Sequence, residues 1–137
     1  DVTIVHLVRD GRAVVNSYEK RGEGWVSTVV SWVVTNTLFS LLGKKDGIDY
    51  VQTSYDQLVQ DEQGIEALAE KLGVDVPAEK IVEAVNNEEY HNFAGNQMRH
   101  EELDEIYYDD SWREELPWWK RKILTLLCYV PNRVWVH

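Results

Sequence analysis

An arginine and a serine near the start of the chain have the types and spacing that bind phosphate. Arg9 follows the apolar run TIVHLV, and Ser17 lies eight residues further on. The planar guanidinium donates in pairs to phosphate oxygens, and a serine in the following helix, its backbone roughly 10 Å away, can donate to the same group. The pattern predicts an anion site. A structural explanation stays open, in which Arg9 pairs with Asp10 or another neighbour and Ser17 bonds its own helix backbone.

The segments around this pair predict an α/β fold. Residues 3–8 are β-branched and apolar, which indicates a strand buried on both faces of a parallel sheet. Asp10 occupies the N-cap position of the helix GRAVVNSYEKR. Arg9 would therefore lie at the carboxyl end of a strand and beside a helix N-terminus, where open α/β sheets bind ligands. A buried helix is expected over 25–42 and a second strand over 48–55.

The rest of the chain predicts helices separated by one long loop. The apolar periodicity after the second strand indicates a helix that ends at Gly73, a C-cap glycine. Pro77 would open another helix, and residues 86–112 lose periodicity and predict an ordered loop. Pro117 would start a final helix and Pro131 would end it.

This order predicts one unit, residues 1–137, with two parallel strands joined by a right-handed crossover. Two strands make a small sheet, and the chain begins at Asp1 within an apolar run. We therefore expect a partial domain whose remaining strands lie upstream.

The charges are distributed unevenly along the chain. The net charge is −10, and residues 54–116 hold eighteen acidic side chains against four basic ones. Residues 117–137 hold four basic side chains and no acidic ones. Duplex nucleic acid requires a broad basic face, so the composition argues against a nucleic acid partner. The acidic stretch fits simple solubility, or an interaction surface for a basic protein.

Other classes of site find little support in the sequence. The single cysteine, Cys128, excludes an internal disulfide framework, and the four histidines have no metal-ligand spacing, so we expect no metal. With neither a signal peptide nor a stretch of roughly 18 apolar residues, a cytoplasmic protein is expected. Trp118 and Trp119 beside a basic run fit a packed helix with a basic outer face, or an interfacial membrane helix.

Four segments, in order, resemble sulfotransferases that use 3′-phosphoadenylyl sulfate (PAPS). VHLVRDGRAVVNS is similar to the family's 3′-phosphate-binding segment, and TSYDQLVQDEQG is similar to its Tyr-Glu-Asp-Leu segment. HNFAGNQMRH and DDSWREELPWWKRKI resemble segments of carbohydrate-type and bacterial members. The resemblance covers residues 2–135 and implies the C-terminal part of a P-loop NTPase-like parallel sheet with flanking helices.

The resemblance also implies roles for particular residues. Arg9, Ser17 and Arg99 would hold the 3′-phosphate of PAPS or of its product PAP, and Tyr55 would lie near the adenine. Gly95 and Asn96 would shape the loop that places Arg99. Tyr55 as a core tyrosine, and Arg99 in a salt bridge with nearby acids of its loop, are the structural alternatives.

The sequence departs from the family pattern in two ways. Gly11 and Gln97 replace prolines of the family's segments, which loosens the backbone without removing a charge. Nothing resembles the P-loop that holds the 5′-phosphosulfate: the glycines around Lys44 and Glu23 have the wrong spacing. His6 is interpreted as a core histidine. No catalytic residue is assigned.

The resulting hypothesis is a PAPS-dependent sulfotransferase, of which this part binds the 3′-phosphate and adenine and is inactive alone. The intact enzyme would transfer a sulfuryl group to an acceptor hydroxyl or amine, possessing no metal cofactor. The resemblance to carbohydrate-type sulfotransferases suggests a carbohydrate as the acceptor. Two alternatives stay open: part of a P-loop small-molecule kinase, and a non-enzymatic acidic module that binds a basic partner.

Overall fold

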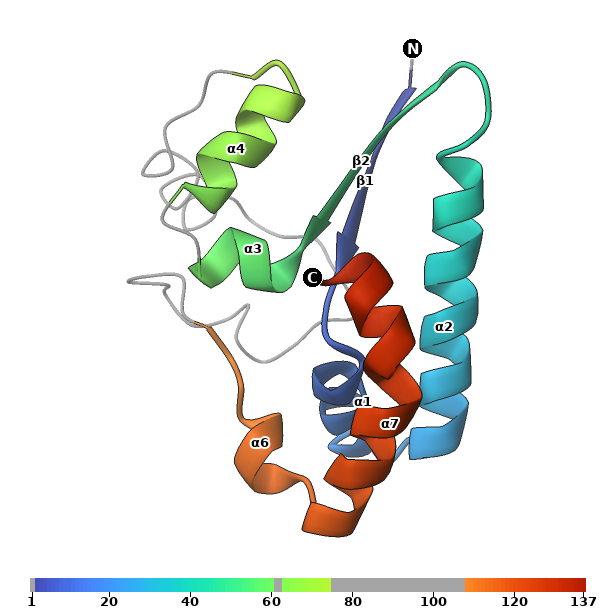
Figure 1. Cartoon of the computed structure of the whole chain (residues 1–137), viewed down its shortest axis with the longest axis vertical. Helices are drawn as coiled ribbons and strands as arrows, with labels where there is room; N and C mark the ends of the chain where they lie inside the picture. The colour runs from blue at the N-terminus through green and yellow to red at the C-terminus, as the bar shows by residue number, and fades with distance from the viewer. Residues whose placement is uncertain (1, 61–62, 75–107) are drawn as a thin grey trace.

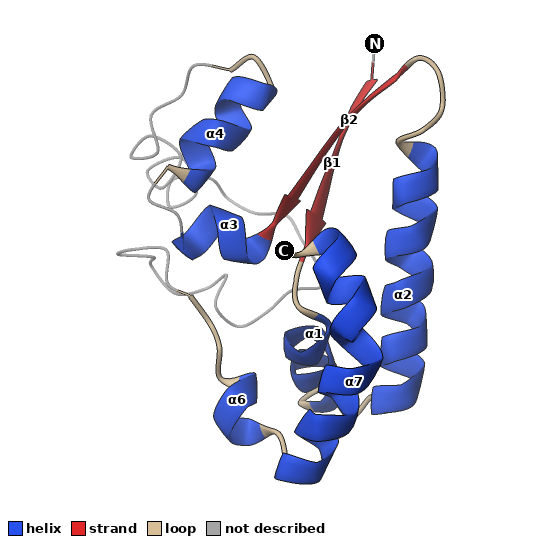
Figure 2. Ribbon diagram, viewed as in Figure 1, coloured by secondary structure: helices blue, strands red, loops and turns tan. Residues whose placement is uncertain are grey.

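The computed structural model describes residues 2–60, 63–74 and 108–137. Their elements, in chain order, are β1 (Val2–Val8), α1 (Gly11–Glu19), α2 (Trp25–Leu42), β2 (Ile48–Ser54), α3 (Tyr55–Gln60), α4 (Gly64–Lys71), α6 (Trp112–Glu115) and α7 (Trp118–Trp135) (Figures 1 and 2). The chain is therefore of mixed α/β class. The predicted helix after Pro77, and most of the predicted loop over 86–112, lie outside the described residues.

The two strands form a parallel pair, as the order of elements predicted. Their register places Val8, the last residue of β1, opposite Ser54, the last residue of β2. Both strands thus end together, and the next residues, Arg9 and Tyr55, start from the same edge of the sheet.

β1 is packed against helices on one face. His6 is 5% exposed, and its Nε2 lies 2.7 Å from Oδ1 of Asn36 in α2, which agrees with the prediction of a core histidine. Val8, on the same face, packs in a cluster with side chains of α2 and α7. Val5 and Leu7, on the other face, are 43% and 52% exposed. The prediction of a strand buried on both faces is wrong because α2 and α7 cover the same side.

α2 buries only one narrow stripe. Thr28, Trp32 and Asn36 are buried at four-residue intervals, facing α1 and β1. The Thr28 hydroxyl donates to the carbonyl of Gly24 at 2.9 Å, and the Asn36 amide to that of Trp32 at 2.7 Å. The exposed part of the helix carries large apolar residues among serines and threonines: Val26, Val30, Val34, Leu38 and Leu41 alongside Ser27, Ser31, Thr35 and Thr37. The prediction of a buried helix is therefore wrong, because the neighbouring elements cover only the stripe of Thr28, Trp32 and Asn36.

α2 also qualifies as a membrane span by length and composition alone, with a mean hydropathy of 1.4 over 18 residues. The sequence had indicated no such stretch, since serines, threonines and an asparagine interrupt the apolar run. Core helices of soluble proteins pass the same test, so the finding is weak evidence for a membrane.

α7 continues through Pro131 to Trp135, so the prediction that Pro131 ends this helix is wrong. A proline within a helix removes one backbone donor and costs about 3 kcal/mol or more. Burial beyond the proline offsets this cost. Asn132 and Val136 are 6% and 2% exposed, and Trp135 packs edge-on against Trp32 with ring centroids 5.7 Å apart.

Buried side chains from the start and the end of the chain form two clusters. One comprises Ala13, Val15, Trp112, Leu116 and Leu124. The other comprises Val8, Trp32, Cys128 and Val136. Burial raises the pKa of the Cys128 thiol to about 11, so this thiol is protonated at neutral pH and serves packing. α7 therefore holds α1 and the end of β1 in place.

The chain after β2 turns directly into two short helices. α3 begins at Tyr55, one residue before the predicted helical pattern, and α4 ends in a turn at Gly73. Gly73 has a φ of +67°, the left-handed conformation that a glycine adopts without strain, which confirms it as the C-cap glycine.

Candidate functional site

Arg9 and Tyr55 meet at the carboxyl ends of the two strands. Because Val8 and Ser54 are opposite each other, the residues that follow them are neighbours across the strand ends. The Cζ atom of Arg9 lies 4.8 Å from the centroid of the Tyr55 ring. Two of the residues predicted from separate segments are thus brought together, in a cation–π contact that orients the guanidinium.

The guanidinium of Arg9 has one carboxylate partner in the described chain. Its Nη2 donates to Oδ2 of Asp109 at 2.7 Å and to the backbone carbonyl of the same residue at 3.1 Å. Its Nε is buried and has no hydrogen-bond partner among the described residues. The structural explanation for Arg9 holds in part: the partner is a residue 100 positions away and not Asp10. Both contacts with Asp109 use Nη2 alone.

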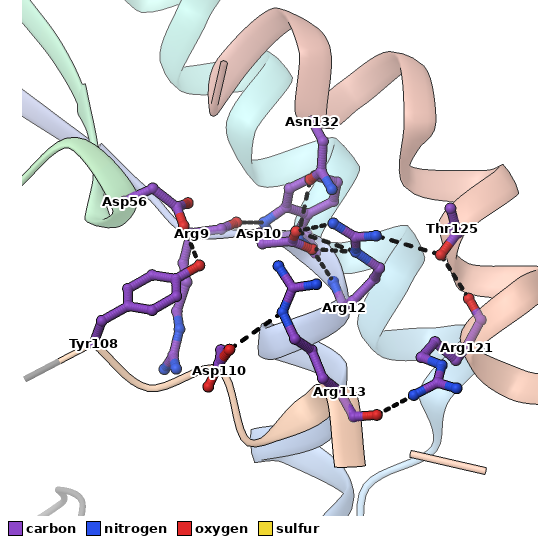
Figure 3. A network of polar contacts seen from close by, with 12 residues as sticks. Arg9, Asp10, Arg12, Asp56, Tyr108, Asp110, Arg113, Arg121, Thr125 and Asn132 are labelled. Atoms are coloured by element: carbon purple, nitrogen blue, oxygen red, sulfur yellow. Dashed lines mark hydrogen bonds and ion pairs between the residues drawn. The ribbon is translucent and has the colours of Figure 1, made fainter. Parts of the chain in front are cut away.

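A second tyrosine extends the aromatic surface beside Arg9. Tyr108 stacks on Tyr55, with centroids 5.8 Å apart and an interplanar angle of 24°. The Tyr108 hydroxyl donates to the carboxylate of Asp56 (Figure 3). Burial, followed by this hydrogen bond and the charge of Asp56, raises the pKa of Tyr108 to about 12. The backbone N–H of Asp109 donates to the Tyr55 hydroxyl at 3.3 Å, which ties the segment to α3.

Asp109 is held as an anion. Burial alone would raise its pKa, but hydrogen bonds from Arg9 and Ser111 outweigh burial and lower the pKa below 3.8. Residues 108 and 109 were not predicted as part of the site. The signal in the sequence is the run YYDD, which brings two aromatic side chains and two carboxylates together just before a helix, but its distance from Arg9 along the chain gives no hint of contact.

Ser17 and Arg99 are not joined to this cluster by any described contact. The Ser17 hydroxyl accepts a hydrogen bond from Nη2 of Arg21 at 3.4 Å, one turn along the same helix. It does not donate to its own helix backbone in the described contacts. Arg99, together with Gly95 and Asn96, lies outside the described residues. The site therefore consists here of Arg9, Tyr55 and the residues of the 108–109 segment.

Asp10 positions α1 and does not face the aromatic pair. Its side chain accepts from the backbone N–H of Arg12 at 2.8 Å, capping the helix as predicted, and pairs with the Arg12 guanidinium at 2.5 Å. Figure 3 shows Asp10 between Arg12 and Asn132 of α7, while the side chain of Arg9 runs the other way, toward the segment of Tyr108. Arg9 and Arg12 therefore bind different carboxylates: Arg9 binds Asp109, and Arg12 binds Asp10.

No protein family model, curated protein or solved structure matches the chain. The chemistry of the site has to be judged from its geometry. An oriented guanidinium whose side chain is 30% exposed can bind an oxyanion, and a pair of stacked tyrosines offers a flat surface for a planar ring. In the described ranges no group of three or more metal-ligating side chains is found. The site is thus equipped to bind an anionic, ring-bearing ligand.

Proposed function

We propose that the chain is part of a PAPS-dependent sulfotransferase with a P-loop NTPase-like sheet, in which Arg9 binds the 3′-phosphate and Tyr55 lies against the adenine. The observation that carries this proposal is the position of Arg9. Its guanidinium lies 4.8 Å from the Tyr55 ring at the common end of two parallel strands, and the Arg9 side chain is 30% exposed. A nucleotide with a phosphate on its ribose presents both groups that this pair would bind.

The residues of the chain fit such a ligand by position and chemistry. Once the phosphate displaces the Asp109 carboxylate from Nη2, the fork of Arg9 would donate two hydrogen bonds to it, the strongest arrangement available to an arginine. The tyrosine stack supports a purine by ring–ring contact. Ser17, in the second turn of α1, and Arg99 are proposed as further phosphate contacts on the basis of the sequence resemblance.

The transfer itself requires groups that we do not assign here. An acceptor hydroxyl or amine attacks the sulfur, the new O–S or N–S bond forms, and the bond from sulfur to the 5′-phosphate breaks. The electron pair of the broken bond leaves with PAP, and the acceptor proton passes to a base. The part that the described residues would play is to bind and orient the nucleotide.

The proposal is tested by calorimetric titration of the chain with PAP, with ATP as the competing nucleotide. We expect PAP to bind and ATP to bind more weakly, since ATP lacks a 3′-phosphate. Arg9→Gln should weaken PAP binding about 10- to 100-fold, because a charge-assisted hydrogen bond contributes about 1.5–3 kcal/mol.

Arg133→Gln is the matched control, because Arg133 is an exposed cation on α7 whose described contact is a 3.4 Å hydrogen bond to the Tyr129 hydroxyl. It should bind PAP as the native chain does. Unchanged PAP affinity in a folded Arg9→Gln chain would refute the assignment. Preference for ATP would instead favour the kinase alternative.

Asp109→Asn should strengthen PAP binding. The Asp109 carboxylate occupies Nη2 of Arg9 and repels an incoming phosphate, whereas an amide keeps the shape and still accepts from Ser111. For a pair about one-third exposed, we expect a two- to fivefold gain, roughly 0.5–1 kcal/mol.

The control for this gain is Asp110→Asn, which removes the same charge from the adjacent residue. Asp110 pairs with Arg113 at 3.3 Å and not with Arg9. If both variants gain equally, the effect is one of net charge, and the predicted competition between Asp109 and the ligand is wrong.

A further inference from the structure

A cavity in the described chain is lined by four cations among six residues. It has a volume of about 360 Å³ and lies where α1, α6 and α7 meet. Its lining residues are Arg12, Trp112, Arg113, Arg121, Lys122 and Thr125. Arg9, Tyr55 and Tyr108 do not line it. The cavity is therefore separate from the site described above, with which it shares no residue.

Two of the guanidiniums are stacked on one indole. Trp112 is 4% exposed, and the Cζ atoms of Arg12 and Arg113 lie 4.2 and 4.8 Å from its ring. Cation–π contacts of this kind fix the planes of the guanidiniums. Their orientation is thus set before any ligand arrives, which reduces the entropy lost on binding.

Backbone and hydroxyl groups fix the rest of the wall. Nη1 of Arg121 donates to the backbone carbonyl of Arg113 (Figure 3). The Thr125 hydroxyl donates to the carbonyl of Arg121 at 2.8 Å and accepts from Nη1 of Arg12 at 3.4 Å. Three guanidiniums are in this way held in one connected network, which Figure 3 shows between α1 and α7.

The positive charge of this wall is only partly neutralised. Arg12 is paired with Asp10 at 2.5 Å, and Arg113 with Asp110 at 3.3 Å, the latter pair being more than half exposed. Arg121 and Lys122 form no ion pair with any carboxylate of the described residues.

The acidic side chain that ends α6 does not compensate them. Glu115 accepts from Lys20 and from Asn16, both at 2.6 Å, so it is directed to α1. Arg121 and Lys122 thus have no carboxylate partner among the described residues, in a chain whose net charge is −10. The local positive charge of the cavity is therefore opposite in sign to the net charge of the chain.

We propose that this cavity binds a tetrahedral oxyanion, a phosphate or sulfate group, with Arg121 and Lys122 as its principal ligands. A planar guanidinium fork matches two oxygens of such a group, and an ammonium neutralises it as a point charge. Arg113 contributes further positive charge, and Thr125 a hydroxyl. The volume of the cavity admits the group together with part of the molecule that carries it.

The test is a titration of the ¹⁵N-labelled chain, followed by the Nε–Hε resonances of its arginines, at ionic strength held constant with sodium chloride. The probes are sodium sulfate and a sulfated tetrasaccharide. We expect both to shift the resonances of Arg113 and Arg121. Saturation by sulfate at an affinity similar to that of the tetrasaccharide identifies a free oxyanion as the ligand. An affinity for the tetrasaccharide at least about tenfold higher identifies an esterified group on a larger molecule.

Arg121→Gln with Lys122→Gln should weaken binding of the tetrasaccharide at least about tenfold. The control is Lys44→Gln with Lys45→Gln, which removes the same charge from an exposed turn. Equal losses in both double variants would show that general charge attraction is the cause, and would overturn the proposal. So would the absence of any shift at constant ionic strength.

Because PAP is itself an oxyanion, titration with PAP distinguishes this cavity from the proposed nucleotide site at Arg9. The Arg121→Gln, Lys122→Gln variant should retain PAP binding that Arg9→Gln loses. Failure of PAP to bind at all, with the tetrasaccharide still binding here, would refute the nucleotide proposal and leave this site standing. Loss of PAP binding in the Arg121→Gln, Lys122→Gln variant would show that the nucleotide occupies the cationic cavity, which contradicts the separate site.

Discussion

Asp10→Ala is expected to destabilise the fold by about 3–5 kcal/mol, the cost of breaking a buried ion pair from one side. The Asp10 side chain is 8% exposed and its partner Arg12 is 19% exposed, so the arginine would be left as an uncompensated, mostly buried charge. The substitution also removes the N-cap hydrogen bond to the Arg12 backbone N–H, at 2.8 Å. Urea unfolding at neutral pH, followed by circular dichroism, measures the loss.

The control for this loss is Asp46→Ala, which removes a carboxylate from an exposed turn and should change stability little. A double variant, Asp10→Ala with Arg12→Ala, should lose less than the two single losses added together, since the stranded charge is gone. Additive losses would show that the pair contributes no coupling, and the expectation would then be wrong.

The pH dependence of stability has the same origin. Burial would raise the pKa of Asp10, but its bonds to Arg12 outweigh burial and lower the pKa below the ordinary 3.8. A carboxyl whose folded pKa is depressed contributes stability above its unfolded pKa, and this stability is lost as pH falls through the folded value. The native chain should therefore lose this contribution below pH 3.8, and Asp10→Ala should lack that part of the acid sensitivity.

Gly11→Pro, which restores the proline of the resembled family segment, is expected to destabilise the chain by about 2–6 kcal/mol. Proline removes the Gly11 N–H, which donates to Oδ1 of Asn132 at 3.1 Å in buried surroundings. An unsatisfied buried acceptor costs about 1–3 kcal/mol. A Cβ at this position would also lie 2.8 Å from Sγ of Cys128 and 3.0 Å from the Trp32 ring, and such overpacking costs roughly 1–3 kcal/mol more.

The two causes are separated by Gly11→Ala, which keeps the N–H and adds only the Cβ. It should cost less than Gly11→Pro, and pairing it with Cys128→Ala should recover part of the loss, because the closest atom is removed. Thermal unfolding of the four chains measures these differences. If Gly11→Pro were as stable as the native chain, the packing between α1 and α7 at Asn132 would differ from that described.

The role of Gly11 depends on a contact between segments that are far apart in the sequence. In the sequence, Gly11 stands where the resembled family has a proline, and the replacement gives up only the φ angle that proline fixes. In the folded chain it is the point where α1 touches α7, 117 or more residues away along the chain, and a glycine is required because any side chain would meet Cys128 and Trp32. A contact between residues so far apart produces no local pattern in the sequence, so the sequence does not predict it.

Local patterns determined the elements that position the candidate site. The β-branched run before Arg9, the N-cap at Asp10 and the left-handed Gly73 are consequences of side-chain shape and backbone freedom within a few residues, and each of these was predicted. The parallel pairing followed from the order of the elements, and it placed Arg9 and Tyr55 at one edge of the sheet.

The tertiary structure alone decided what those residues contact. Asp109 on Arg9, Tyr108 on Tyr55, and the cations gathered around Trp112 all depend on the return of residues 108–137 to the first strand and helix. The same return carries α7 past Pro131, because the burial of Asn132 and Val136 outweighs the proline's local cost. Sequence periodicity reports which side of an element is apolar, whereas the partner that covers it, and the charge left uncovered, are fixed only when distant segments pack together.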